Sequence, residues 1–380
     1  MNKKALPLFI KKRIKEKYQN RFINEWGGVH ILSPKPFADD DILLCSNDYL
    51  CLRRDSKLFS KNAGVFDDML MSSVFLGDDS IQSRLEKQFA YFFNFENSII
   101  CQSGWMANAG LIQSIANEQT PVYIDFLAHM SFRDGIRLAN AKPYVFEHNN
   151  ANSAKRKIIR YGPGIIIVDS VYSTNGSLCP LYDFAILAKE YDCVLVVDES
   201  HSAGTHGHEG RGLVSALDLT EDVDFITISL AKAFAGRAGL IVCNTEFKDY
   251  FLTESHPAIF SSAVMNNDLQ WFSDAIPFII SSDERRKRLH SNAKYIREEL
   301  KNSGYNVSGG TEQIIAVEIG YEKHVQILQN RLYDKGIVGS VFCYPATAKN
   351  RALIRLTINS GLSSIDLTRI VNGFKDITHQ

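Results

Sequence analysis

Two short apolar runs with a glycine-rich segment between them constrain most strongly how this chain folds. The first run, residues 194–197, ends at Asp198, and His201 follows three positions later. The second run, residues 225–230, is followed by Lys232. Runs of this length, rich in β-branched residues, predict strands that are buried on both faces, as in a parallel sheet. The carboxyl ends of parallel strands meet at one edge of the sheet, where open α/β sheets bind ligands.

The order of Asp198, His201 and Lys232 along the chain is expected to bring an acid, an imidazole and an amine together at that edge. Such a set suits a pyridinium cofactor that is bound covalently to a lysine. Each residue also has a simpler interpretation: Asp198 as a helix cap, His201 as a hydrogen-bonded core histidine, and Lys232 as a solvated lysine at a strand end. The order of all three, with Ser229 three positions before the lysine, favours the cofactor site.

The same stretch resembles the α-oxoamine synthases, which are fold-type I pyridoxal-phosphate enzymes. Within that family, the chain is similar above all to the α-hydroxyketone autoinducer synthases of Vibrio and Legionella, which make quorum-sensing signals. The resemblance rests on residues 102–105, 123–131, 198–207, 257–262 and 339–347. It implies an α/β fold of type I, in which a mostly parallel seven-stranded sheet lies between helices in a large lobe and a smaller C-terminal α+β lobe follows.

The resemblance also implies roles for the cofactor-binding residues. Lys232 would hold pyridoxal phosphate and later act as the base for an α-proton. Asp198 would face the pyridine nitrogen and favour its protonated form, while His129 would stack on the ring. The ring hydroxyl would be held by Ser173 and His201, and the phosphate by Gly104, Trp105, Ser229 and, from the neighbouring subunit, Ser261 and Ser262. Without the resemblance, the glycine turn is only a weak phosphate motif and the serines are ordinary turn residues.

Two further residues are expected to bind substrate. Residues 46–50 resemble a stretch that lies near the substrate carboxylate in the family, which implies this role for Asn47. Arg355 lies in a predicted strand, and an arginine that is partly buried needs an anionic partner. By resemblance the partner is a substrate carboxylate, and a structural ion pair is the alternative. At residues 71–77, larger apolar side chains replace the family's Gly-Ser-rich loop, which implies either a more apolar channel or ordinary core packing.

The implied reaction joins a medium-chain fatty acyl-CoA to S-adenosylmethionine or to a small amino acid such as 2-aminobutyrate, with decarboxylation. The product would be an aminoketone or aminoenone, the precursor of an α-hydroxyketone autoinducer. The housekeeping alternatives are 8-amino-7-oxononanoate synthase, 2-amino-3-ketobutyrate CoA ligase and 5-aminolevulinate synthase, and the missing Gly-Ser-rich loop argues against them. A non-catalytic, ligand-binding form of the fold is a further alternative, against which the retention of Lys232, Asp198 and His201 argues.

Length and composition set the remaining expectations. A chain of 380 residues suffices for two joined lobes, and we expect a helical arm at 1–45, a large cofactor-binding domain at 46–265 and a small domain at 266–380. Residues 6–26 predict an amphipathic, basic helix that docks on the body or on a second subunit.

The net charge of −1 and the lack of a long apolar run predict no nucleic-acid partner and no membrane span. The seven scattered cysteines predict reduced thiols, no metal site and a cytoplasmic location, and the shared phosphate site implies a homodimer.

Overall fold

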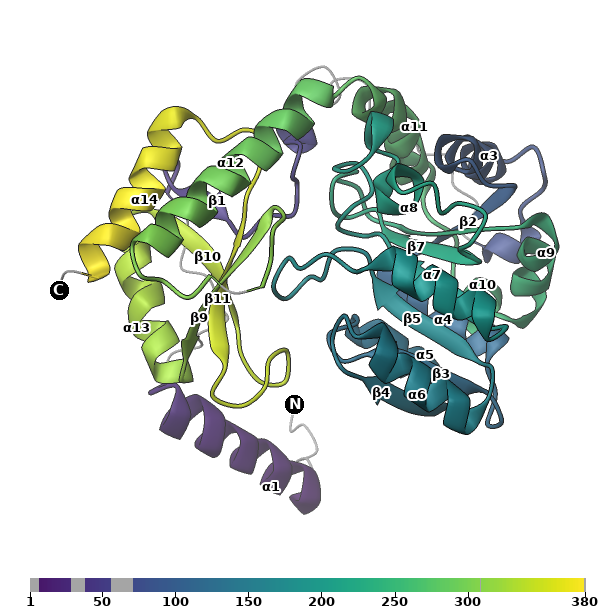
Figure 1. Ribbon diagram of the computed structural model, residues 1–380, viewed down its shortest axis with the longest axis horizontal. Coiled ribbons are helices and arrows are strands. Elements are labelled where there is room, and N and C mark those ends of the chain that lie inside the picture. Colours follow the sequence, from purple (N-terminus) through teal and green to yellow (C-terminus); the bar gives the residue numbers. More distant parts are fainter. Residues whose placement is uncertain (1–6, 29–37, 56–70, 308, 379–380) are drawn as a thin grey trace, which may run out of the picture.

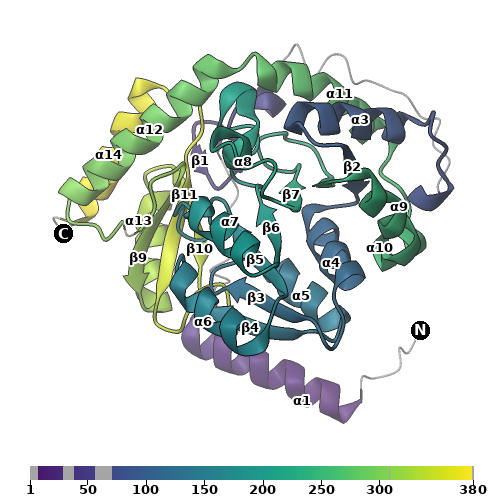
Figure 2. The same ribbon diagram turned by 45° about the vertical axis from the view of Figure 1, so that its right-hand side comes forward.

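The computed structural model describes residues 7–28, 38–55, 71–307 and 309–378. A seven-stranded sheet forms the centre of a large lobe, and a four-stranded sheet forms the centre of a small lobe. Figures 1 and 2 show the two lobes side by side. Helix α11 (Asn266–Ile280) lies on the large lobe and leads into α12 (Asp283–Asn302), which lies along the small lobe.

The large sheet is parallel except for one strand. Its order is β2-β8-β7-β6-β5-β3-β4, and β8 runs antiparallel to both of its neighbours. The strands are β2 (Asn97–Cys101), β3 (Pro121–Asp125), β4 (Lys142–Phe146), β5 (Ile165–Asp169), β6 (Val194–Asp198), β7 (Phe225–Ser229) and β8 (Gly239–Cys243). Every residue of β5 is buried, as the continuous apolar run predicts for a strand with helices on both faces. The predicted α/β class and the mostly parallel seven-stranded sheet are confirmed.

Alternate residues of the central strands pack into two separate cores, one on each face of the sheet. In β5, for example, Ile166 and Val168 belong to one core and Ile165 and Ile167 to the other. The first core includes side chains of α3 (Ile81–Phe93), α6 (Ala151–Tyr161) and α7 (Leu181–Glu190). The second includes side chains of α4 (Gly104–Ile115), α5 (Met130–Leu138), α9 (Thr245–Glu254) and α10 (His256–Phe260).

The small sheet combines strands from both ends of the chain. Its order is β1-β10-β11-β9, with β1 parallel to β10 and the other pairs antiparallel. The elements of this lobe are β1 (Ile42–Leu44), β9 (Ile314–Gly320), α13 (Glu322–Tyr333), β10 (Ile337–Phe342), β11 (Ala352–Thr357) and α14 (Ser364–Thr378). Because β1 lies within residues 1–45, part of the expected arm belongs to this sheet. The domain division at residues 45 and 265 stays a proposal.

The N-terminal segment is helical, as its amphipathic pattern predicts. Helix α1 (Leu8–Lys17) continues into a π-helical stretch, Tyr18–Glu25. The segment docks on the small lobe, where Arg21 donates to the carbonyl oxygen of Tyr344 and the Trp26 Nε1 donates to Glu322 Oε2 at 2.6 Å. Among the described residues, no helix combines the length and the apolar character needed to cross a membrane.

Candidate active site

The functional side chains converge where three parallel strands end. Asp169 and Asp198 are the last residues of β5 and β6 and lie opposite each other in the register of the sheet. Ser229 is the last residue of β7, and Lys232 follows in the turn after it. The sheet therefore places an acid and an amine at one edge, as the order of residues along the chain predicts.

A cavity of about 990 Å³ lies at this edge, between the two lobes. Nine of the twelve predicted site residues line it: Gly104, Trp105, His129, Ser173, Asp198, His201, Ser229 and Lys232 from the large lobe, and Arg355 from the small lobe. Asn47 does not line the cavity, but its Oδ1 accepts a hydrogen bond from the guanidinium of Arg355 at 3.4 Å. Ser261 and Ser262 do not line the cavity of their own chain.

The contacts of Asp198 favour a negative charge on its carboxylate. Asn108 Nδ2 donates to Asp198 Oδ2 at 2.8 Å, and the main-chain N–H of Ser200 donates to Asp198 Oδ1 at 2.8 Å. Donors of this kind stabilise the ionised form. Burial, and then the charge of Asp198, raises the pKa of the neighbouring Asp169 well above its ordinary value.

Lys232 is held in a state suited to nucleophilic chemistry. Burial lowers the pKa of its amine to about 8, and the positive charge of Arg355 adds to this effect, while Asp198 opposes it. A lysine with this pKa is uncharged for a substantial fraction of the time near neutral pH. The uncharged amine is the form that bonds covalently to a carbonyl group.

His201 is neutral, and its ring is hydrogen-bonded to the hydroxyl of Tyr49. Burial, with the charges of Lys232 and Arg355, lowers the pKa of His201 well below its ordinary value. Burial raises the pKa of Tyr49, so its hydroxyl keeps its proton. The Tyr49 hydroxyl lies 2.7 Å from His201 Nδ1, and the two groups share a hydrogen bond. The other ring nitrogen, Nε2, is left to contact a ligand in the cavity, which His201 lines.

His129 is connected by hydrogen bonds to the residues around Asp169 and Asp198. Its main-chain N–H donates to Asp169 Oδ1 at 3.3 Å, and its Nδ1 lies 2.8 Å from Ser131 Oγ. Asn108, which donates to Asp198, also donates to Ser131 Oγ at 3.0 Å. The Trp105 ring meets the His129 ring edge-on, with centroids 5.7 Å apart. These contacts fix the plane of the His129 ring at the cavity wall.

Gly104 begins helix α4 at a point where no larger residue fits. A Cβ atom on Gly104 would lie 2.6 Å from the Cβ of Ser229. The preceding Ser103 caps the helix by accepting from the main-chain N–H of Met106. The free N–H groups at the start of a 12-residue helix carry partial positive charge and attract anions, so this end of the cavity suits a phosphate.

Arg355 is buried, and its guanidinium contacts only neutral groups. It donates to the carbonyl oxygen of Ser173 at 3.0 Å and to Asn47 Oδ1 at 3.4 Å, and it lies over the Phe342 ring. Across residues 7–28, 38–55, 71–307 and 309–378, no carboxylate forms an ion pair with it, and its Nε has no acceptor. A buried guanidinium in this state retains the capacity to bind an anion.

Comparison with known proteins identifies the group of enzymes. The family model for class I and II aminotransferases matches residues 39–374. The chain belongs to this family. It is 40% identical, over 98% of its length and 96% of the relative's, to a CAI-1 autoinducer synthase of Vibrio campbellii. It is 33% identical to an 8-amino-7-oxononanoate synthase of Petrotoga mobilis, over 88% of the chain and 87% of that enzyme.

Solved structures of this family share the fold. A serine palmitoyltransferase of Sphingomonas wittichii superposes with a TM-score of 0.89 at 21% identity, covering 98% of both chains. An 8-amino-7-oxononanoate synthase from Francisella tularensis gives a TM-score of 0.79 at 23% identity, covering 90% of this chain and 99% of its own. The fold is that of the type I pyridoxal-phosphate enzymes. Within the family the chain is an α-oxoamine synthase, a pyridoxal-phosphate-dependent acyltransferase.

The residues present fit the cofactor of the family, pyridoxal phosphate. The cavity offers a weakly basic lysine, a buried carboxylate and the glycine start of α4. We infer that Lys232 holds the aldehyde carbon, Asp198 the pyridine nitrogen, and Gly104 with Ser229 the phosphate.

Several residues of this family site were not predicted from the sequence. Asn108, Asp169 and Tyr49 each orient a predicted residue. Asn108 lies one helical turn after Gly104, and Asp169 ends a strand as Asp198 does, so their spacing offered a hint. Tyr49 pairs with a residue 152 positions away, and no local pattern encodes that contact.

Two stretches with predicted roles lie away from the cavity. Ser262 accepts from Gln102 Nε2 at 2.9 Å through its carbonyl oxygen and forms an isolated bridge with Ser72. The role of Ser261 and Ser262 at a neighbouring subunit's phosphate stays a prediction. In the segment 71–77, Val74 packs against a core while Phe75 is 72% exposed, so this stretch is not simply core.

Proposed function

We propose that this enzyme condenses a medium-chain fatty acyl-CoA with S-adenosylmethionine or a small amino acid such as 2-aminobutyrate. The coenzyme A thiol and carbon dioxide are released, and the product is an aminoketone. With S-adenosylmethionine, elimination of its sulfonium group as 5′-methylthioadenosine gives an aminoenone, and either product precedes an α-hydroxyketone autoinducer. The observation that carries the proposal is the meeting of Lys232, Asp198 and Arg355 in one cavity. The relative at 40% identity, named an autoinducer synthase, supports the choice of product.

The amine donor is held at its carboxylate. Arg355 offers a fork of N–H donors that matches a carboxylate, and its burial strengthens the contact. Asn47 Oδ1 and the Ser173 carbonyl oxygen fix the guanidinium by accepting from it. An amino acid bound in this way presents its amine and α-carbon toward Lys232, which lines the same cavity.

Lys232 and Asp198 then have different roles in the reaction. When bound, pyridoxal phosphate withdraws electrons from the α-carbon of an attached amino acid, which makes loss of its proton or carboxylate possible. The Lys232 Nζ receives the α-proton, for which its lowered pKa is suited. Asp198 would hold the pyridine nitrogen through its carboxylate, and His129, whose ring is fixed at the cavity wall, would lie against the ring.

The acyl chain is expected to lie along the apolar wall of the cavity. Large apolar side chains that line it are partly exposed: Trp105 at 41%, Phe126 at 57%, Met130 at 41% and Tyr344 at 49%. Exposed apolar groups that gather around a cavity mark a site for an apolar ligand. A fatty acyl chain would cover them, whereas an acetyl group is too small to do so.

We also propose a cytoplasmic homodimer. The seven cysteines are free in the structure, which agrees with a reducing compartment. Phe260, directly before Ser261, is 79% exposed at the end of α10. An exposed aromatic side chain beside the two serines is consistent with a subunit interface that shares the phosphate site.

A steady-state substrate screen tests the proposed reaction. The enzyme loaded with pyridoxal phosphate is given acetyl, pimeloyl and a series of medium-chain acyl-CoAs, each with S-adenosylmethionine, 2-aminobutyrate, alanine, glycine or serine. We expect kcat/KM for a medium-chain thioester to exceed that for acetyl or pimeloyl about tenfold or more, because each methylene buried in an apolar pocket adds selectivity. A preference for pimeloyl or acetyl thioesters would show that a housekeeping synthase is the correct assignment.

A further inference from the structure

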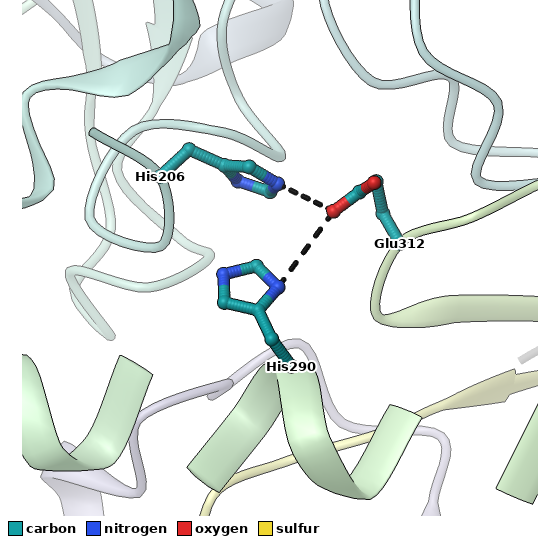
Figure 3. Close-up of side chains that lie close together, drawn as sticks. All are labelled: His206, His290 and Glu312. Atoms are coloured by element: carbon teal, nitrogen blue, oxygen red, sulfur yellow. Dashed lines mark hydrogen bonds and ion pairs between the residues drawn. The ribbon is translucent and has the colours of Figure 1, made fainter. Parts of the chain in front are cut away.

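A second cluster of ligand-type side chains lies outside the cavity, between the two lobes. His206 lies on the loop after β6, His290 lies on α12, and Glu312 precedes β9 (Figure 3). His206 Nε2 lies 2.7 Å and His290 Nδ1 lies 3.7 Å from the same carboxylate oxygen, Glu312 Oε2. All three candidate ligand atoms lie within 4.8 Å of one another.

The partners of the two rings show which nitrogen of each faces Glu312. His290 Nε2 lies 2.8 Å from the carbonyl oxygen of Thr205, which can only accept, so Nε2 carries the proton. The Thr205 hydroxyl donates to the carbonyl oxygen of His201 at 3.0 Å and therefore accepts from His206 Nδ1, which lies 2.9 Å away. His206 Nε2 and His290 Nδ1 are thus the ring nitrogens that face the carboxylate, and His206 Nε2 is hydrogen-bonded to Glu312 Oε2 at 2.7 Å.

A metal ion placed where the two nitrogens and the carboxylate oxygen meet would replace the hydrogen bond between His206 Nε2 and Glu312 Oε2. The Thr311 hydroxyl donates to Glu312 Oε1 at 2.8 Å, which leaves Oε2 as the oxygen that faces the rings. Figure 3 shows all three side chains pointing toward one another. Imidazoles whose second N–H is held by a protein oxygen are typical of metal ligands, because this partner fixes the tautomer and the ring.

We propose that His206, His290 and Glu312 bind one zinc ion, with water as the fourth ligand. Two histidines and a glutamate form one of the three-ligand sets that zinc adopts, with an open fourth position. Zinc–ligand bonds of about 2.0–2.1 Å place tetrahedral ligand atoms about 3.3 Å apart, so His206 Nε2 and Glu312 Oε2, now at 2.7 Å, would move apart on binding, and His290 Nδ1, now at 3.7 Å, would move closer. The His290 side chain is 37% exposed, whereas His206 and Glu312 are 9% and 12% exposed, so the ion and its water enter past His290.

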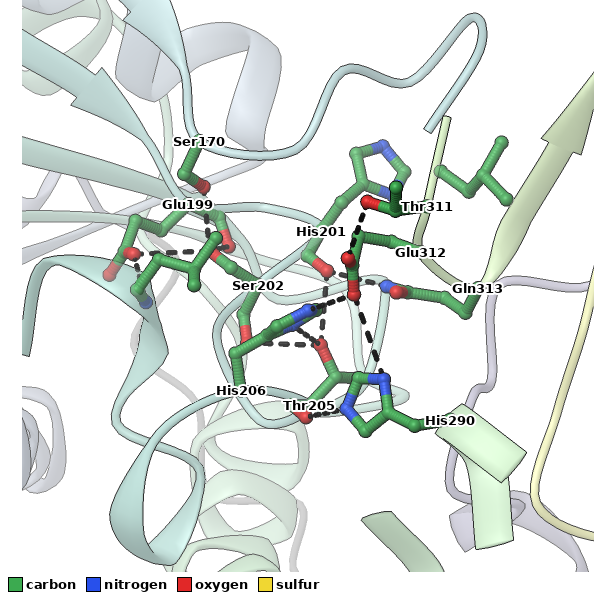
Figure 4. A network of polar contacts seen from close by, with 12 residues as sticks. Ser170, Glu199, His201, Ser202, Thr205, His206, His290, Thr311, Glu312 and Gln313 are labelled. Carbon is green, nitrogen blue, oxygen red and sulfur yellow. Dashed lines mark hydrogen bonds and ion pairs between the residues drawn. The ribbon is translucent and has the colours of Figure 1, made fainter. Parts of the chain in front are cut away.

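The bound ion would hold the lobes together next to the active site. Gln313, the neighbour of Glu312, donates to the carbonyl oxygen of His201 at 2.6 Å, and Thr205 donates to the same oxygen (Figure 4). Both contacts of the His201 main chain therefore come from residues adjacent to the proposed ligands. Zinc is expected to act as a positioning element for His201 and not in the reaction itself.

Zinc binding to the intact holoenzyme tests this proposal. After treatment with a chelator and dialysis, ZnCl₂ is titrated into the wild type and into Glu312→Gln, His290→Asn and His324→Ala. We expect one zinc ion per chain in the wild type and in His324→Ala, whose histidine is exposed on α13. We expect the affinity to fall about 100-fold or more in the other two variants. MgCl₂ should not compete, because magnesium prefers oxygen ligands.

Two further readouts separate this site from others. Zinc should raise the thermal midpoint of the wild type and of His324→Ala but not of Glu312→Gln, and retained cofactor absorbance shows that each variant is folded. CoCl₂ in place of zinc should give visible bands without thiolate charge transfer, since no cysteine is proposed as a ligand. If the wild type binds no more zinc than Glu312→Gln and His290→Asn do, the proposal is wrong, and the three side chains join the lobes only through their hydrogen bonds and ion pairs.

Discussion

A few neighbouring groups determine the hydrogen bonding of Asp198 and the pKa of Lys232. Asn108 and the Ser200 N–H stabilise the carboxylate of Asp198, while burial and Arg355 lower the pKa of Lys232 to about 8. A buried carboxylate and a weakly basic amine therefore line the same cavity. Acids and bases in enzymes are commonly tuned in this way by burial and by neighbouring charge.

The substitution Asp198→Asn tests the first of these groups. The amide keeps the size of the side chain but removes the carboxylate that we infer would hold the pyridine nitrogen. We expect bound cofactor at near wild-type occupancy and kcat lowered about 100-fold or more, because proton removal from the α-carbon loses its charge partner. Exchange of the substrate's α-proton in deuterated buffer measures that step directly.

The surface variant Asp222→Asn serves as a control, since Asp222 pairs only with the exposed Lys189 in the described structure. Unchanged exchange in Asp198→Asn would show that this aspartate acts only in capping the turn after β6.

At the scale of elements, Glu199 anchors the segment that follows β6. Its buried carboxylate accepts from the main-chain N–H groups of Leu213 at 2.6 Å and Val214 at 2.9 Å, at the start of α8 (Gly212–Ala216). The Ser202 hydroxyl donates to the same carboxylate at 3.1 Å. These contacts, part of the network in Figure 4, hold the glycine-rich segment against the strand that carries Asp198.

The pH dependence of stability tests this anchor. Burial raises the pKa of Glu199 from 4.5 to about 7. The N–H contacts lower this pKa, but their effect is smaller than that of burial. Between these values the unfolded chain is ionised at this group while the folded chain is protonated. Its stabilising contribution is therefore present below the unfolded pKa and is lost as the pH rises through about 7, at up to about 1.4 kcal/mol per pH unit. Glu199→Gln should remove this dependence.

Thermal midpoints measured from pH 4.5 to 7.5 provide the comparison. The wild type and the exposed control Glu221→Gln should lose stability over this range by a greater amount than Glu199→Gln does. Equal slopes in all three proteins would contradict the role given to Glu199.

Elements with continuous apolar runs could be predicted from the sequence, and short or interrupted ones could not. The runs at 165–169 and 194–198 form central strands, in which every side chain is buried except that of Val194, which is half-buried. Strand β1 has only three residues, and Gly339 and Ser340 interrupt β10, so their local pattern was too weak. Asp198 and Lys232 follow strands and were predictable, whereas the contact of Asn108 with Asp198 joins residues 90 positions apart.

At the scale of the whole molecule, the reactive groups depend on the meeting of the two lobes. The large lobe supplies Lys232 and Asp198, and the small lobe supplies Arg355, Phe342 and Tyr344. The N-terminal helical segment docks beside Tyr344, because Arg21 donates to the carbonyl oxygen of that residue. A change that separates the lobes is therefore expected to weaken substrate binding before it affects the fold of either sheet.

Labelling of the cofactor-linked lysine tests the central claim most directly. The purified enzyme is saturated with pyridoxal phosphate, its visible spectrum is recorded, and borohydride is added to make the covalent link permanent before peptide mapping. We predict a yellow protein that bleaches, with the label on Lys232 in the wild type and in the control Lys189→Ala, and no label or turnover in a folded Lys232→Ala. A label on another lysine, or turnover by Lys232→Ala, would contradict the assignment of this site.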